Sequence, residues 1–518
     1  MGKVFFKNNW QILVFNLVVI IAFIVGYGHF GDIMVDSFRE AYIPAQIIKG
    51  QVLYKNIFNI YAPFSYLFNS LLFLIFGVHL KILYTAGLLA TLGVLNLVFK
   101  ISNEFMNKTY ALSIVLFVIS VGVLSPNVFN YIFPYSFGML YGLLFILASI
   151  YFALKDKFQL AYLMYSFAIC SKYEFALLLP LLLFVTGKND LLKNIIALLL
   201  PIIITYSPLF VMNVGIENIL ASAQIILTMS STKTLYWFYS ITGLVFRPEI
   251  LPIYLINLIK VLIPLLFMYY WRSWWLIILT AIYFYFAATP DLFIYIFPLI
   301  LILFVIRFRK LSHEKIFFVL ASLLISMKIF FAETFLSYGV FFIPFALISI
   351  FILIPPRFKK ALFIITLICA LNFGIKNTIS LSQKNVKVET ERGVFYSATG
   401  EVINQVINYI NKNTKSTDKV VIYPECLAVN FLTSRDSDNK FYSLIPLYVE
   451  TFSEDVIIKR LDIIKPEYIV ISNYNTSNYY YSYFGQDYAG GIYGYVLLNY
   501  DKQADFGRKM SFIVYKRK

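Results

Sequence analysis

The sequence predicts a polytopic α-helical membrane protein with about 13 transmembrane helices and a C-terminal soluble α/β domain. Of its 518 residues, 60% are hydrophobic and 14% are charged, and the mean hydropathy is +0.76. Soluble proteins carry about 25% charged residues, so this apolar content needs lipid as its solvent. Residues 1–376 contain 26 Lys and Arg against 12 Asp and Glu, whereas residues 377–518 contain 17 against 15. We therefore place a membrane module at 1–376 and a soluble domain at 377–518.

The apolar runs give the order of the expected spans. The first run, 10–30, is long enough to cross a bilayer and no small-residue cleavage site follows it, which predicts a retained helix. Two later runs are interrupted by the polar stretches "SKYE" and "TPD", and each predicts two helices joined by a short hinge. The remaining runs lie at 62–78, 81–99, 109–124, 134–154, 158–187, 190–212, 251–270, 273–307, 315–331, 335–356 and 360–376.

Basic loops set the expected orientation. "RFRKLSHEK" (307–315) and "RFKK" (357–360) are the strongest, and such loops stay on the cytoplasmic side. The last span then leaves residues 377–518 outside the cytoplasm, in a protein of the plasma (inner) membrane. Counting spans from the two ends gives orientations that differ by one crossing between 60 and 188. We therefore expect one short apolar run there not to be a full crossing.

The tail has the pattern of a small α/β domain. "GEVINQVINYINKNT" and "EDVIIKRLDIIK" have apolar residues at helical spacing, and "DKVVIYP" and "PEYIVISN" read as buried strands. No glycine-rich phosphate loop follows either strand, so we expect no nucleotide cofactor. The three Cys and three His show no metal-ligand spacing, which argues against a structural zinc site or a disulfide framework. Topology explains the basic excess, and no nucleic-acid partner is expected.

Ionisable groups beside a bilayer are costly to place and are therefore functional candidates. Simpler interpretations stay open for each group. Asp36 and Glu40, with Arg39 between them, also fit a solvated interfacial helix with a local ion pair. Lys172 and Glu174 also fit a pair that holds the hinge, and "FRPE" (246–249) fits a loop entering the next span. The candidates expected on the outer face are Asp32, Asp36, Arg39, Glu40, Lys172, Glu174, Arg247, Glu249, Asp291 and Glu333.

The first loop (32–61) and the apolar run after it, "DSFREAYIPAQIIKGQVLYKNIFNIYAPFSYLFNSLLFLIFG", resemble the first outer loop of bacterial integral-membrane GT-C glycosyltransferases. Such loops carry an acid, an Arg-Glu pair, a Gly-x-x-Leu-Tyr turn, a Pro before the next span and a closing Phe-Gly. Those features are here Asp36, Arg39-Glu40, Gly50 to Tyr54, Pro63 and Phe76-Gly77. The tail stretches "ERGVFYSATGEVINQVINYINKNTKSTDKVVIYPECLAVNFLTSR" and "YFGQDYAGGIYGYVLLNYD" are similar to the extracytoplasmic end of the same group.

The resemblance implies an inverting transfer of a sugar from a polyprenyl-phosphate carrier to a glycan, lipid or protein acceptor. It implies that Asp36 is the general base, with Asp32 as the nearby alternative. A phosphate leaving group needs cations, and Arg39, Lys172 and Arg247 are the candidates. Glu40, Asp32 and Glu333 are the supporting acids. Asp36 with Glu40 is also a candidate for binding a divalent cation, which the sequence leaves open.

Two other classes of protein share many of these features. A transporter or lipid flippase would show two related halves with matched broken helices, and the sequence shows no such pairing. A polysaccharide polymerase or ligase that handles lipid-linked glycans would carry its large outer loop between late spans. The sequence does not specify the donor sugar, the acceptor, the metal dependence or the oligomeric state.

Overall fold

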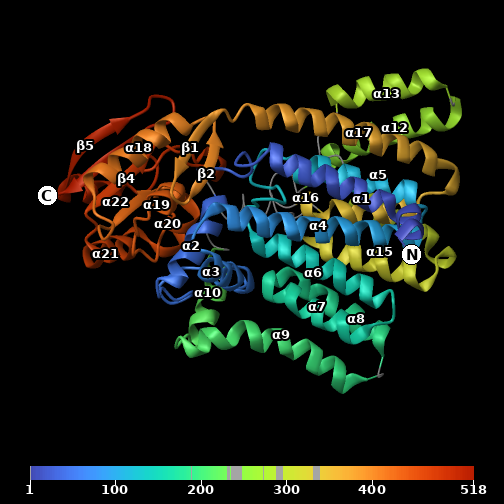
Figure 1. Cartoon of the computed structure of the whole chain (residues 1–518), viewed down its shortest axis with the longest axis horizontal. Helices are drawn as coiled ribbons and strands as arrows, with labels where there is room; N and C mark the ends of the chain where they lie inside the picture. Colours follow the sequence, from blue (N-terminus) through green and yellow to red (C-terminus); the bar gives the residue numbers. More distant parts are fainter. Residues whose placement is uncertain are drawn as a thin grey trace.

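The computed structural model describes residues 2–34, 36–187, 190–229, 234, 248–271, 273–287, 296–330 and 339–518. A bundle of long helices forms one part of the molecule, and a mixed α/β region caps one end of it (Figure 1). The N-terminus lies at the end of the bundle far from this cap.

The bundle is built from apolar helices, as predicted, and the chain is an integral membrane protein. Four described helices (α4, α9, α12 and α17) are long and apolar enough to cross a membrane, and eight shorter apolar helices have 10 to 17 residues. The count of about 13 spans stays a prediction. The bundle helices are α1 (Gly2–Val25), α4 (Leu80–Phe105), α5 (Lys108–Val118) with a π-helical turn (Ile119–Val123), α6 (Phe137–Ala153), α7 (Phe158–Ser171), α8 (Leu179–Thr186), α9 (Leu191–Val211), α10 (Ile216–Met229), α12 (Leu251–Trp271), α13 (Trp274–Ala287), α14 (Phe297–Arg307), α15 (His313–Ser326), α16 (Gly339–Leu353) and α17 (Pro356–Ser382).

Helix α3 (Phe64–Phe76) is the short apolar run that does not cross the bundle. At its start, the Tyr66 hydroxyl donates a hydrogen bond to Glu40 in the first loop. After its end, the Leu80 amide donates to the carbonyl of Arg392 in the C-terminal region. Both ends of α3 therefore lie at the capped end of the bundle, beside α2 (Arg39–Ile48) (Figure 1). With α3 left out, the expected topology counts from the two ends agree, and the orientation itself stays a prediction.

The hinge expected at "SKYE" is present. Helix α7 ends at Ser171, Lys172 is extended with φ −154° and ψ 114°, and a 3-10 turn (Tyr173–Leu178) leads into α8. The turn places Lys172 and Glu174 at the capped end of the bundle, because Lys172 contacts Tyr61 of the first loop. The second expected hinge, at "TPD" (289–291), lies outside the described residues.

The C-terminal region contains the expected helices and strands and four strands that were not predicted. The expected elements are α18 (Gly400–Asn413), β3 (Val420–Tyr423), α21 (Glu454–Ile464) and β4 (Tyr468–Ser472). The sheet order is β3-β4-β6-β5, with β3 and β4 parallel and the other neighbours antiparallel. The additional elements are the hairpin β1 (Val386–Thr390) and β2 (Gly393–Ser397), β5 (Tyr500–Phe506), β6 (Phe512–Arg517), α19 (Leu427–Thr433), α20 (Pro446–Phe452) and α22 (Gly490–Asn499).

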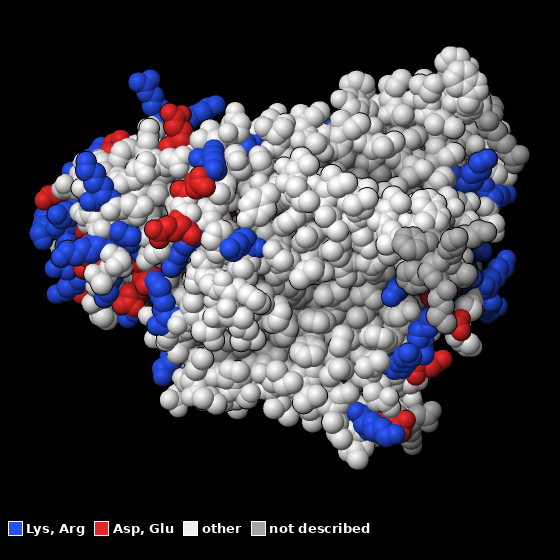
Figure 2. All heavy atoms as spheres, in the orientation of Figure 1, with Lys and Arg blue, Asp and Glu red and all other residues white. Residues whose placement is uncertain are grey.

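Charge follows this division of the molecule. Figure 2 shows Lys, Arg, Asp and Glu crowded over the C-terminal region and gathered again at the opposite end, with a broad and almost uncharged zone between them. Such a zone is the surface that a bilayer would cover. The first loop and the C-terminal region meet at one border of this zone.

Candidate active site

Asp36 begins the candidate site in the loop that follows the first helix. It opens a short 3-10 turn (Asp36–Phe38) that leads into α2, and its φ of +39° is a left-handed conformation that is unfavourable for a non-glycine residue. The Nη1 of Arg39 donates a 2.6 Å hydrogen bond to Oδ1 of Asp36. The Asp36 side chain is still 37% exposed, whereas that of Arg39 is 8% exposed. Asp36 is therefore a carboxylate that is held in place and yet open to a substrate.

Arg39 and Glu40 together fix the start of α6. Nη2 of Arg39 donates to the carbonyl of Tyr135 at 2.8 Å, and the amide of Phe137 donates to Oε2 of Glu40 at 2.8 Å. Glu40 is fully buried, and its Oε1 accepts from the Tyr66 hydroxyl at 2.8 Å and from Nε of Arg39 at 3.4 Å. Burial opposes the charge on Arg39, but Asp36, nearby tyrosines and Glu40 hold its pKa well above the usual range. The pair is thus a framework that holds Asp36.

Lys172 approaches the same place from the hinge after α7. Its Nζ lies 4.8 Å from the centre of the Tyr61 ring and 5.8 Å from the centre of the Tyr135 ring. The guanidinium carbon of Arg39 lies 5.0 Å from the centre of the same Tyr61 ring. These distances are within the range of cation–π attraction. The structure thus brings Lys172 and Arg39 together at the Tyr61 ring, and Arg39 binds Asp36.

The Gly-x-x-Leu-Tyr turn explains how Tyr61 is held between the two cations. Gly50 adopts φ +89°, which glycine tolerates without strain, and turns the chain after α2. The Tyr54 hydroxyl then donates to the carbonyl of Tyr61 at 2.6 Å, and the Asn59 amide donates to the same carbonyl at 2.7 Å. The turn motif therefore positions the ring that Arg39 and Lys172 share.

Two glycines on α6 let the hinge approach closely. A Cβ at Gly138 would lie 2.6 Å from the carbonyl oxygen of Ser171, and one at Gly142 would lie 2.5 Å from the Phe175 ring. Small residues four apart are a common device for close helix packing in membranes. This contact was not predicted from the sequence, although the spacing Gly-x-x-x-Gly within an apolar run could have indicated it.

Asp32 has a different environment from Asp36. Its Oδ1 accepts from the amide of Met34 at 2.7 Å, and the Ser37 hydroxyl accepts from the Asp32 amide at 3.1 Å. These hydrogen bonds shape the turn before Asp36. Asp32 also acts on Lys384, whose ammonium donates to the carbonyls of His29, Gly31 and Pro126. Burial lowers the pKa of Lys384 to about 8, and Asp32 opposes this by favouring the charged form. Asp32 is therefore best placed to support the loop.

Three expected site residues, Arg247, Asp291 and Glu333, lie outside the described part of the chain. Within the described residues, no three His, Cys, Asp or Glu are grouped to hold a metal ion. Glu40 does not fit the suggested metal pair with Asp36, because both of its oxygens accept hydrogen bonds from protein donors and the residue is fully buried.

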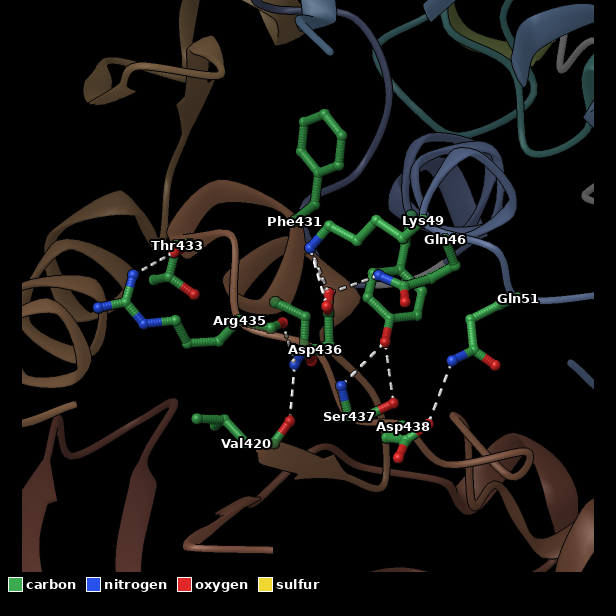
Figure 3. Close-up of polar contacts among 12 residues, drawn as sticks. Gln46, Lys49, Gln51, Val420, Phe431, Thr433, Arg435, Asp436, Ser437 and Asp438 are labelled. Atoms are coloured by element: carbon green, nitrogen blue, oxygen red, sulfur yellow. Dashed lines mark hydrogen bonds and ion pairs between the residues drawn. The ribbon is translucent and has the colours of Figure 1, made fainter. Parts of the chain in front are cut away.

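The C-terminal region is attached to the first loop by an interdomain clamp, which consists of Gln46, Lys49, Gln51, Asp436 and Asp438. Nζ of Lys49 lies 2.8 Å from both carboxylate oxygens of Asp436, and Gln46 donates to Oδ1 of Asp436 at 2.7 Å. Figure 3 shows these side chains reaching from α2 toward the loop after α19, with Gln51 donating to Asp438 beside them at 3.2 Å. The clamp fixes the C-terminal region over the site.

Glu425 is a candidate site residue that was not predicted from the sequence. It follows β3 and precedes α19, and the Ser443 hydroxyl donates a hydrogen bond to its Oε1. Burial raises its pKa to about 8, with Asp36 and Asp32 also raising it and Ser443 and Arg39 lowering it. A single acid after a strand carries no local signal, and only the packing of α19 on α2 brings it to the first loop.

The chain is similar to ArnT from Cupriavidus metallidurans. The crystal structure of that protein bound to undecaprenyl phosphate matches with a TM-score of 0.48 and 11% identity, over 98% of both chains. Its apo structure gives 0.46 and 13% over the same shares. The Archaeoglobus fulgidus oligosaccharyltransferase, tethered to an acceptor peptide, gives 0.48 and 12%, over 90% of this chain and 69% of that one. At these values the likeness is one of architecture only.

Comparisons at the level of sequence find no relative. No family model matches the chain, and no curated protein matches it.

Proposed function

We propose that the protein is a glycosyltransferase that moves a sugar from a polyprenyl-phosphate carrier to an acceptor at the outer face of the membrane. The observation that carries the proposal is the grouping of one partly exposed carboxylate, Asp36, with two cations, Arg39 and Lys172, around Tyr61. Displacement at an anomeric carbon requires a base for the attacking hydroxyl and positive charge for the departing phosphate. The grouping supplies both.

The roles divide according to exposure and partners. Asp36 takes the proton of the acceptor hydroxyl while the new bond to the anomeric carbon forms. The bond between that carbon and the phosphate oxygen breaks, and its electron pair leaves with the polyprenyl phosphate. Lys172 stabilises the charge on that phosphate. Arg39 adds positive charge and holds Asp36, since three of its nitrogens already donate to Asp36, Glu40 and Tyr135. A single displacement of this kind inverts the anomeric centre.

Helix α3 supports a lipid-linked donor. It leads toward Gly77 and exposes several large apolar side chains: Leu71, Leu74, Ile75 and Phe76 are 49%, 70%, 60% and 63% exposed. Apolar surface of this kind is covered by lipid in a membrane protein. A polyprenyl tail can therefore lie along α3 while its phosphate reaches Lys172.

Reconstitution tests the proposal directly. The purified protein in liposomes is given undecaprenyl phosphates that carry a labelled hexose or pentose, together with acceptor membranes from cells that lack this gene. We expect label to move to the acceptor fraction without any nucleotide sugar, and Asp36→Asn protein to move almost none. Equal transfer by the parent and Asp36→Asn proteins, or transfer only from a nucleotide sugar, would overturn the proposal.

A further inference from the structure

Glu425 reaches the first loop through two helices that run side by side. Near the start of the pair, the Cys426 thiol lies 3.7 Å from the carbonyl oxygen of Ile33. Near its end, Asp436 binds Lys49 and Gln46. Helices α2 and α19 therefore run parallel, from the acidic residues to the interdomain clamp. Cys426 adopts φ +124°, a strained conformation for a non-glycine residue that is compatible with a functional constraint at this turn.

The surroundings of Glu425 differ from those of Lys172. The charged groups that act on the Glu425 carboxyl are Asp36, Arg39 and Asp32 from the first loop. In the C-terminal region, the negative charge of Glu425 would help to raise the pKa of four neighbouring tyrosines, Tyr442, Tyr474, Tyr479 and Tyr488. The carboxylates of Asp32 and Asp36 repel a phosphate on this side of the site. A hydroxyl group carries no charge and forms hydrogen bonds with carboxyl oxygens. The site thus has a cationic side at Lys172 and an acidic side at Glu425.

The hydrogen bonding of Glu425 leaves one of its oxygens available. Among the described residues, Ser443 is the donor to Oε1, and none of them donates to Oε2. The residue is only partly exposed. A carboxylic acid that keeps its proton presents an O–H donor as well as acceptor oxygens. Burial and the nearby acids Asp36 and Asp32 favour this neutral form, and they raise the pKa of Glu425 to about 8.

We propose that Glu425 is a second acid of this site, which holds the hydroxyl-bearing acceptor by donating a hydrogen bond from its protonated carboxyl while Asp36 receives the proton of the attacking hydroxyl. This rests on the proposed function and adds the acceptor side to it. Glu425 stays protonated from start to finish, so the proton released by the acceptor goes to Asp36 alone. The acceptor is an uncharged group with hydroxyls, since an anionic one would meet Asp32 and Asp36.

The test compares Glu425→Gln with Glu425→Ala in the reconstituted transfer assay, from about pH 6 to about pH 9. Glutamine keeps a donor of similar shape and does not titrate, whereas alanine has no donor. We expect the parent rate to fall as the pH rises through about 8, because the proton on Glu425 is lost there. Glu425→Gln should keep transfer near neutral pH and lack that fall. Glu425→Ala should lose about tenfold, mostly through a higher KM for the acceptor.

Glu454→Gln is the matched control. Its carboxylate accepts a 2.9 Å hydrogen bond from the amide of Ile492, in the same region but away from the first loop. We expect it to keep the parent pH profile. Binding of undecaprenyl phosphate, measured separately, should be unchanged in both Glu425 variants because the phosphate lies at Lys172. If Glu425→Ala does not insert into the membrane, the rate and pH profile of Glu425→Gln still test the role of Glu425.

The outcomes separate the two proposals. Three results would overturn the role of Glu425 and leave the transferase standing. The first is a Glu425→Gln protein that is as inactive as Glu425→Ala, and the second is an unchanged fall in rate near pH 8 in Glu425→Gln. The third is a Glu425→Ala rate within about twofold of the parent rate. Parent protein that transfers no sugar from any of the labelled carriers would overturn the proposed function, and this inference with it.

Discussion

Lys172 lies with its ammonium 4.8 Å from the centre of the Tyr61 ring, although Tyr61 belongs to the first loop and Lys172 to the hinge after α7. Tyr61 also faces the guanidinium of Arg39, which holds Asp36. One aromatic ring therefore connects a cation from the hinge after α7 with the acid of the first loop.

Replacement of Asp36 by asparagine should abolish transfer without unfolding the protein. The carboxylate is partly exposed, and loss of a general base typically costs about 10²–10⁴-fold in rate. Initial rates in liposomes measure the effect. Asp32→Asn is the control: its side chain supports a turn, so it should lose far less. A dead Asp32→Asn beside an active Asp36→Asn would move the role of base to Asp32.

Lys172→Met should impair use of the donor substrate more than use of the acceptor. A charge-assisted contact with phosphate contributes about 1.5–3 kcal/mol, so we expect kcat/KM for the donor to fall by roughly one to two orders of magnitude. Lys172→Arg keeps the charge and should recover part of the loss. Titration with undecaprenyl phosphate reads binding without turnover. Identical affinities for the parent and Lys172→Met would show that the phosphate binds elsewhere.

Glu40→Ala should destabilise the protein itself. The variant leaves Nε of Arg39 and the amide of Phe137 without their buried acceptor, and removal of one partner of a buried pair costs about 3–5 kcal/mol. Thermal unfolding in detergent measures the loss. Glu40→Gln, which keeps an acceptor oxygen, should lose less. A melting temperature for Glu40→Ala equal to that of Asp36→Asn would contradict the framework role.

The clamp pair Lys49 and Asp436 should contribute little to stability on its own. The two side chains are 35% and 34% exposed, and exposed ion pairs contribute about 0–1 kcal/mol. A double-mutant cycle with Lys49→Met and Asp436→Asn should therefore give a coupling below about 1 kcal/mol that shrinks further at high salt. A coupling of several kcal/mol would mean that the pair is far less hydrated than its exposure indicates.

Cysteine labelling should test the orientation and the path of α3. The three native cysteines are buried, so an exposed new thiol gives a clear signal. Asn475→Cys and Lys81→Cys should react with a membrane-impermeant maleimide added outside, whereas Ser312→Cys should react only after the membrane is opened. A reporter fused after Lys518 that works only outside the cytoplasm should also be active. Labelling of Lys81→Cys from the inside alone would mean that α3 crosses.

The sequence predicts elements well where the local pattern decides the structure. The helix at 400–413, the strands at 420–423 and 468–472 and the hinge at Lys172 follow from apolar spacing and a polar interruption. Strand β5, "YDKQADF", is too charged to predict, because its pairing with β6 forms the strand. Helix α3 has the composition of a span, and only its contacts at both ends show that it does not cross.

The site was predictable to a similar extent. Asp36 and Arg39 are close in the chain, and Lys172 stands out because a cation interrupts an apolar run. Glu425 has no such local signal, since its position near the first loop depends on the packing of α19 against α2.

The parallel pairing of α2 and α19 has a consequence for biogenesis. The first loop emerges early in synthesis, whereas Glu425 and Asp436 leave the ribosome only after the intervening helices have entered the bilayer. Until that last part folds, a nascent chain holds the carrier-binding cations but lacks the acid and the clamp on the acceptor side. Under the proposed function, sugar transfer therefore reaches its full rate only when the whole chain has been delivered, and an arrested chain uses lipid-linked sugar more slowly.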